Sequence, residues 1–195
     1  MSLEKIISEA IQGSIDVKTL VLQKLQKEIL QAGLLCVDVY KNKGKILLCG
    51  NGGSSCDASH IAAELIVRFK SENNRIALPA ISLSGDAAVI TACANDNGYD
   101  QIFARQVEGL GKAGDLLIAL STSGNSNNIN LAIEAARKNN MKTICLLGKT
   151  GGTAKGKSDL DIIIPSMDTA RIQECHIMLG HVFCSIIEKE LFGLD

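Results

Sequence analysis

The sequence is short of the features that mark several common protein classes. Its 195 residues carry a formal net charge of −1 without a block of like charges, so there is no basic surface to attract nucleic acids or anionic membranes. No apolar stretch approaches the ~20 residues of a membrane span, and residues 1–14 mix charged residues with Ile and Leu instead of forming a signal peptide. Seven cysteines occur without a C-x-x-C pair. We therefore expect a cytoplasmic protein with buried free thiols that binds neither nucleic acid nor membrane.

The apolar content is sufficient for one folding unit. Hydrophobic residues make up 46% of the chain, and no linker, internal repeat or low-complexity tract divides it. We expect residues 1–195 to form a single domain, in which about residues 1–42 are an N-terminal helical extension.

The spacing of apolar residues predicts an α/β fold. Helical periodicity without proline runs from Ile15 to Tyr40, and a second long helical pattern runs from about Thr169 to Leu191. Between them, short apolar runs alternate with helical segments, which is typical of strands buried on both faces of a parallel sheet. We predict five such strands, in the runs 45–49, 80–84, 115–120, 143–148 and 160–165.

The first candidate site is the loop "CGNGGSS", residues 49–55. It follows a predicted strand and precedes a predicted helix, where ligands bind in open parallel sheets. Glycines allow close approach of the backbone, and the free N–H groups of the next helix favour an anion such as phosphate. The loop lacks both G-x-G-x-x-G and the P-loop pattern, which argues against NAD and ATP. The alternative is a tight strand-to-helix connection without a ligand.

A second loop repeats this arrangement after the predicted strand 115–120. It carries four hydroxyl groups around one glycine, from Ser121, Thr122, Ser123 and Ser126. Each hydroxyl can donate to a phosphate oxygen, whereas helix capping needs only one of them. We therefore predict a phosphate monoester here, with Ser123 or Ser126 as an alternative helix cap.

His60 and Glu64 lie four residues apart on the helix after the first loop, so they share a face. Their small, apolar neighbours predict a buried face rather than a surface ion pair. The C-terminal helix adds Gln173, His176 and His181, and Gln173 and His181 can face one cavity across two turns. Spacing alone does not choose between His176 and His181 as a functional residue.

Five segments together resemble one known family: "GNGGSSCDASHIAAEL", "ACANDNGYD", "LSTSGNS", "LLGKTGG" and "TARIQECHIMLGH". In this order and spacing they are similar to the phosphoheptose isomerases of the SIS (sugar isomerase) superfamily. The resemblance runs from about residue 15 to the C-terminus. It implies a flavodoxin-like SIS fold and a homotetramer with active sites between subunits. It also implies conversion of sedoheptulose 7-phosphate to D-glycero-D-manno-heptose 7-phosphate, the first step toward ADP-heptose for lipopolysaccharide or other surface glycans.

The resemblance assigns a role to each matching position. The family's sugar contacts correspond to Asn51, Gly52, Gly53, Asn95 and Asp96, and its phosphate contacts to Ser54, Ser121, Thr122, Ser123 and Ser126. The family's zinc ligands correspond to His60, Glu64, Gln173 and His181, of which Glu64 and Gln173 also contact substrate. Glu64 and His181 match the catalytic pair, and His176 is left with a structural role.

The implied reaction suits these side chains. An aldose–ketose isomerisation through an enediol needs one base for a carbon-bound proton, which we expect to be Glu64, and a group that moves protons among oxygens, which we expect to be His181. The first alternative is a non-enzymatic SIS scaffold of the type that bridges the bacterial replication initiator, which is expected to lack the acidic residue and the histidine at these two positions. The second is an isomerase of a pentose or hexose phosphate.

Overall fold

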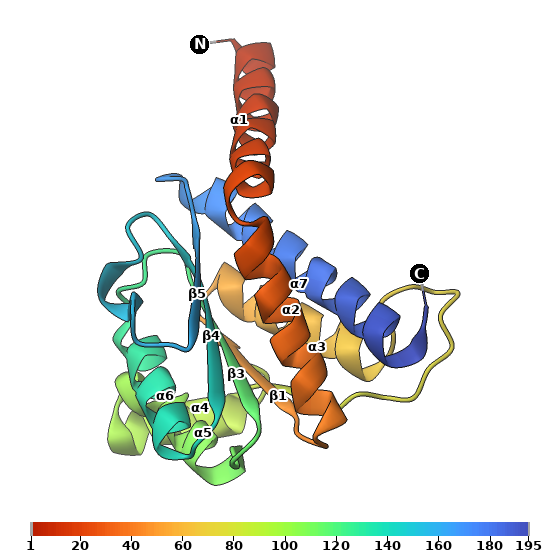
Figure 1. Cartoon of the computed structure of the whole chain (residues 1–195). Coiled ribbons are helices and arrows are strands. Elements are labelled where there is room, and N and C mark those ends of the chain that lie inside the picture. The colour runs from red at the N-terminus through yellow and green to blue at the C-terminus, as the bar shows by residue number, and fades with distance from the viewer. Residues whose placement is uncertain (1, 195) are drawn as a thin grey trace.

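All five apolar runs that were predicted as strands lie in one parallel sheet (Figure 1). The computed structural model describes residues 2–194. Its strands are β1 (Ile46–Gly50), β2 (Ala80–Ser82), β3 (Leu116–Ser121), β4 (Lys142–Gly148) and β5 (Leu160–Ile164), in the order β2-β1-β3-β4-β5. Each neighbouring pair is parallel. The predicted flavodoxin-like α/β fold is therefore confirmed.

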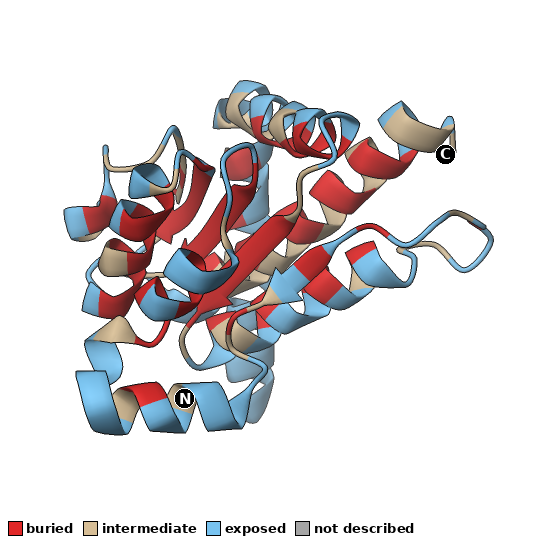
Figure 2. Cartoon of the chain, turned by 90° about the horizontal axis from the view of Figure 1, so that it is seen from below, coloured by how far each residue is buried: buried red, intermediate tan, exposed pale blue. Residues whose placement is uncertain are grey.

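Helices cover both faces of the sheet because its central strands are apolar on both sides. One face packs against α2 (Gln26–Lys41), α3 (Gly53–Ile66) and α7 (Thr169–Phe192). The other packs against α4 (Ala87–Asn97), α5 (Ala104–Leu110) and α6 (Asn127–Lys138). Short 3-10 turns, η1 (Tyr99–Gln101) and η2 (Gly152–Ala154), complete the connections. Along β1, Leu48 faces the first layer and Leu47 the second, so the buried core lies on both sides of the strands (Figure 2).

The helical prediction for residues 15–40 is confirmed, but as two helices instead of one. The α1 helix (Leu3–Lys24) ends at Leu25, whose backbone (φ −121°, ψ 7°) is not helical, and α2 begins at Gln26. Because α2 packs on α7 while α1 projects from the body of the molecule, the chain bends between them (Figure 1). Apolar residues along α1, including Ile7, Ile11 and Ile15, are consequently exposed.

One cysteine contradicts the prediction of uniformly buried thiols. Six cysteines are buried, but Cys56 is exposed. It lies in the first turns of α3 on the stripe that also carries Ser59 and His60, and this stripe faces away from the sheet. Over residues 2–194, no helix combines the length and the apolar character that crossing a membrane requires.

Candidate active site

The first loop lies at the point in the sheet where the strand order reverses. The chain runs from β1 to β2 at one edge and then crosses to β3 on the other side of β1, so the loops after β1 and β3 are neighbours at a topological switch point. Gly52 is the N-cap of α3 and has φ 54° and ψ −124°, a conformation that disfavours residues with a side chain. A Cβ at Gly53 would collide with the side-chain amide of Gln173. The two glycines therefore bring the start of α3 close to α7.

The hydroxyl groups of the second loop line a cavity of about 70 Å³ with Asn51 and Ser54 of the first. Ser121 Oγ accepts from the Gly124 N–H at 3.1 Å, so the Ser121 O–H remains available as a donor. Ser126 is the N-cap of α6, yet its side chain makes no capping hydrogen bond. The alternative prediction that Ser126 serves only as a cap is therefore wrong.

No charged side chain lines this cavity, and its positive character comes from the backbone. The cavity lies at the N-terminal ends of α3 and α6, where unpaired N–H groups and the helix dipole favour an anion. A small cavity with several hydroxyl donors and two helix N-termini has the chemistry of a phosphate site.

The structure brings His60, Glu64 and His181 together. His60 Nε2 lies 3.2 Å from Glu64 Oε1 and 3.0 Å from His181 Nε2. The His60 and His181 rings have centroids 5.1 Å apart, and the Phe69 ring stacks on His181 with centroids 5.2 Å apart. The His60 side chain is 49% exposed and that of Glu64 is 23% exposed, so the prediction of a buried face is wrong for this single chain.

These three side chains can hold a metal ion. Their ligand atoms all lie within 4.8 Å of one another. Ligand atoms about 2.0–2.1 Å from a tetrahedral zinc ion lie roughly 3.4 Å apart, close to the observed separations. Two imidazoles and one carboxylate are also a donor set that catalytic zinc sites use. The residues present therefore fit a divalent metal.

Gln173 and His176 lie only about 60° apart around α7, yet they have different surroundings. Gln173 Nε2 donates to Asp57 Oδ1 at 3.5 Å, and burial raises the pKa of the Asp57 carboxyl, which this hydrogen bond and nearby His60 partly offset. His176 is fully buried, with Nε2 3.0 Å from the carbonyl oxygen of Leu147. Burial lowers the pKa of His176 to about 4, so the ring is neutral at pH 7 and packs inside the core.

Asn95 and Asp96 lie at the exposed C-terminal end of α4. Asn95 Nδ2 donates to Asp96 Oδ1 at 2.8 Å, and within residues 2–194 no hydrogen bond joins either to another predicted site residue. The segment that follows α4 contacts the site through Tyr99 instead, whose hydroxyl donates to Asn51 Oδ1 at 3.1 Å.

Three residues that contact the site were missed by sequence reasoning. Asn128 exchanges two hydrogen bonds of 2.9 Å with Asn51, and Asp57 contacts Gln173. Asp57 precedes His60 by one helical turn, and this spacing is a signal that was available. Tyr99 lies in a polar loop and Asn128 at a helix start, where the sequence carries no comparable signal.

Comparison with known proteins shows the family to which the chain belongs. A profile of the SIS domain matches residues 11–148, so the chain is an SIS-domain protein. The phosphoheptose isomerase of Leptospira biflexa is 57% identical over 195 residues, covering both chains completely. That of Nitratiruptor is 53% identical and covers 87% of this chain and 89% of its own. Within the SIS-domain proteins, the chain therefore belongs to the phosphoheptose isomerase family.

Solved structures of this family have the same fold. The phosphoheptose isomerase of Francisella tularensis superposes with a TM-score of 0.93 at 40% identity, covering 97% of this chain and all of that one. The enzyme of Neisseria gonorrhoeae gives 0.89 at 39% identity, covering 96% and 100%.

Proposed function

We propose that this chain converts sedoheptulose 7-phosphate to D-glycero-D-manno-heptose 7-phosphate, the first step toward ADP-heptose for surface glycans. The observation that carries the proposal is the convergence of Glu64, His60 and His181 in a chain that also has a hydroxyl-lined anion cavity. The family relationship supplies the heptose 7-phosphate as substrate. The chain acts as one SIS domain preceded by a helical segment of about residues 1–42.

The phosphate group of the sugar accepts hydrogen bonds from hydroxyl groups of the first and second loops. The phosphate contacts are Ser54, Ser121, Thr122, Ser123 and Ser126, and the sugar contacts are Asn51, Gly52, Gly53, Asn95, Asp96 and Gln173. Because the Asn51 amide is held on both sides by Asn128, its remaining N–H has a defined direction toward the sugar. Holding the phosphate in place orients the reacting carbons, which lowers the barrier through proximity.

Glu64 takes the proton from C1 of the ketose and returns it to C2, so that an enediol forms and collapses to the aldose. Its carboxylate is only partly exposed, and His60 holds it at 3.2 Å. His181 moves protons among the sugar oxygens, and the stacking of Phe69 keeps its ring from rotating freely.

His60, Glu64, Gln173 and His181 would hold one zinc ion in each subunit. When bound, zinc supplies a Lewis acid that polarises the sugar carbonyl. Gln173 is an unusual ligand, and its amide oxygen is free for this role because the amide nitrogen donates to Asp57.

The assembly that we propose is a cytoplasmic homotetramer with its active sites between subunits. Apolar side chains exposed on α1 continue into a groove of about 480 Å³ between α1, α2 and α7. Such surfaces are uncommon on monomers. A neighbouring subunit would also cover the exposed His60.

The direct test is turnover of sedoheptulose 7-phosphate beside fructose 6-phosphate, with the product identified by NMR. We expect the seven-carbon aldose phosphate from the first substrate and little product from the second. Equal or preferred turnover of the six-carbon sugar would replace the substrate in this proposal. Binding without turnover of either sugar would favour a scaffold protein.

A further inference from the structure

A buried ion pair lies outside the proposed site, at the opposite end of α7 from Gln173. Arg75 Nε is 2.8 Å from Glu188 Oε1, and the two side chains are 1% and 2% exposed. Arg75 belongs to the segment 67–79 that joins α3 to β2, and Glu188 to the last turns of α7. Burying two charges is costly unless hydrogen bonds satisfy both groups, so their remaining partners show what the pair holds.

Arg75 makes three further hydrogen bonds, one to the main-chain oxygen of its neighbour Ile76 at 3.0 Å and two to the end of α3. Its Nη2 donates to the main-chain oxygen of Glu64 at 2.7 Å, and its Nη1 to that of Leu65 at 2.9 Å. Carbonyl groups in the last turn of a helix have no partner within the helix, and a cation there is favoured by the helix dipole. Arg75 thus caps α3 at the residue that carries the proposed base.

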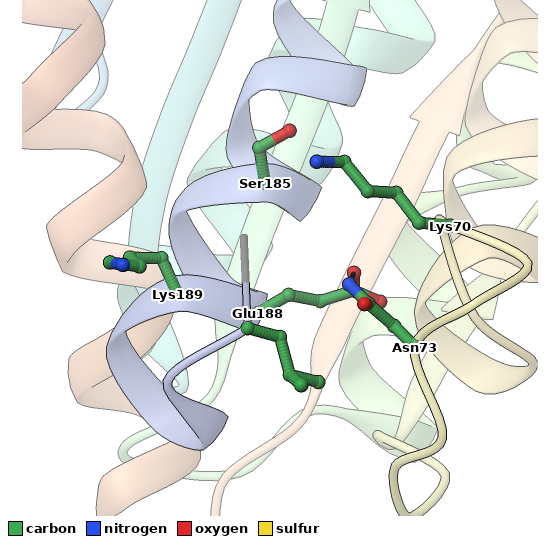
Figure 3. Close-up of a pocket in the computed structure, with 6 residues that line it drawn as sticks. Lys70, Asn73, Ser185, Glu188 and Lys189 are labelled. Carbon is green, nitrogen blue, oxygen red and sulfur yellow. Dashed lines mark hydrogen bonds between the residues drawn. The ribbon is translucent and has the colours of Figure 1, made fainter.

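The remaining hydrogen bonds of Glu188 hold the segment 67–79. Glu188 Oε2 accepts from Asn73 Nδ2 at 2.6 Å, and Oε1 accepts from the backbone N–H of Phe69 at 3.1 Å. Figure 3 shows the Glu188 carboxylate facing Asn73 beside a cavity of about 240 Å³. Burial raises the pKa of Glu188, but its hydrogen-bond donors more than offset this, so the pKa lies below its ordinary value and the group is ionised at pH 7.

Phe69, whose backbone N–H donates to Glu188, also contacts His181 through its side chain. The Phe69 ring stacks on the His181 imidazole at 5.2 Å with an interplanar angle of 29°. The ion pair is therefore linked to both proposed catalytic residues. Arg75 binds the main-chain oxygen of Glu64, and Glu188 binds the backbone of Phe69, which stacks on His181.

We propose that Arg75 and Glu188 are positioning residues that set Glu64 and His181 relative to each other for proton transfer. This inference rests on the proposed function, because it assigns the orientation of that reaction's base and proton shuttle. A displacement of about 1 Å in a reacting group reduces turnover by roughly 10²-fold, so the effect falls on kcat. The phosphate cavity lies at the N-terminal ends of α3 and α6, and the pair contacts only the opposite, C-terminal end of α3, so substrate affinity is preserved.

The test uses Arg75→Lys in the full-length protein. A lysine keeps the charge opposite Glu188, but one ammonium group lacks the planar fork that bridges the carboxylate and three main-chain carbonyls. We expect kcat to fall by about 10- to 100-fold, with KM and inhibition by inorganic phosphate within about threefold of wild type. Arg105→Lys alters the exposed Arg105–Glu108 pair and serves as the matched control without effect.

A second variant, Phe69→Leu, leaves the buried ion pair intact and removes only the ring on His181. We expect a smaller loss of kcat and the same retention of phosphate inhibition. Since the chain has three histidines, ¹⁵N-labelled imidazoles in zinc-free protein provide a readout independent of turnover. The His181 signals should shift in both variants while those of His176 stay in place.

The outcomes separate this inference from the proposed function. A folded Arg75→Lys variant with wild-type kcat and unchanged His181 signals would overturn the positioning role. Parallel losses of kcat and of phosphate inhibition would also overturn it, because they indicate general loosening. If wild type itself fails to isomerise the sugar, the proposed function falls, and the imidazole signals still test whether the pair orients His181.

Discussion

Replacing Ser126 with alanine separates ligand binding from helix capping. An N-cap serine normally contributes about 1 kcal/mol through its side-chain hydrogen bond, but Ser126 makes none to α6. Stability should therefore change by less than about 0.5 kcal/mol. If the hydroxyl donates to a phosphate oxygen, its loss removes one hydrogen bond to a charged group, worth about 1.5–3 kcal/mol. Phosphate binding should weaken by about 10- to 100-fold.

The measurement is inhibition by inorganic phosphate together with thermal unfolding. Asp86→Ala is the control, because Asp86 caps α4 with hydrogen bonds to two backbone N–H groups. It should lower the melting temperature and leave phosphate inhibition unchanged. If Ser126→Ala instead destabilises the protein as Asp86→Ala does, while phosphate inhibits it as strongly as wild type, the phosphate assignment of the second loop is refuted.

Three further predictions concern the acid–base groups. Glu64→Gln keeps the size of the side chain and removes the base, so turnover should fall by about 10² or more while calorimetry still detects substrate binding; near wild-type turnover would exclude Glu64 as the base. His181→Asn should lose turnover and also retain less zinc on dialysis against a weak chelator, whereas retained activity would move the role to another residue. His176, with a pKa lowered by burial to about 4, binds its proton more readily when unfolded, so its contribution of roughly 3 kcal/mol is present above about pH 6.5 and is lost as pH falls toward 4. Urea unfolding of wild type and His176→Gln between pH 4 and 7 should show a steeper loss for wild type, and equal slopes would contradict this.

The sequence by itself determined the elements and the loops of the site. Strands buried on both faces must be apolar at every position, so β1, β3 and β4 were readable as continuous runs. The glycines before α3 and the hydroxyls before α6 stand at strand ends, and in a parallel sheet such ends meet at one edge. The resemblance to the phosphoheptose isomerases added the substrate and the roles, which spacing alone does not contain.

Only the tertiary structure decided how the helices present their polar residues. His176 and His181 differ by about 140° around α7, and packing places His176 at hydrogen-bond distance from the carbonyl oxygen of Leu147 and His181 at such a distance from His60. Periodicity describes a helix but not its rotation against neighbours, which depends on all the side chains at the contact.

The bend at Leu25, the exposure of Cys56 and the Arg75–Glu188 pair have the same origin. The two members of the pair are 113 residues apart in the sequence, and each alone looks like an ordinary surface charge. Their burial follows from where the segment 67–79 meets the end of α7, and long-range contacts of this kind leave no local pattern to read.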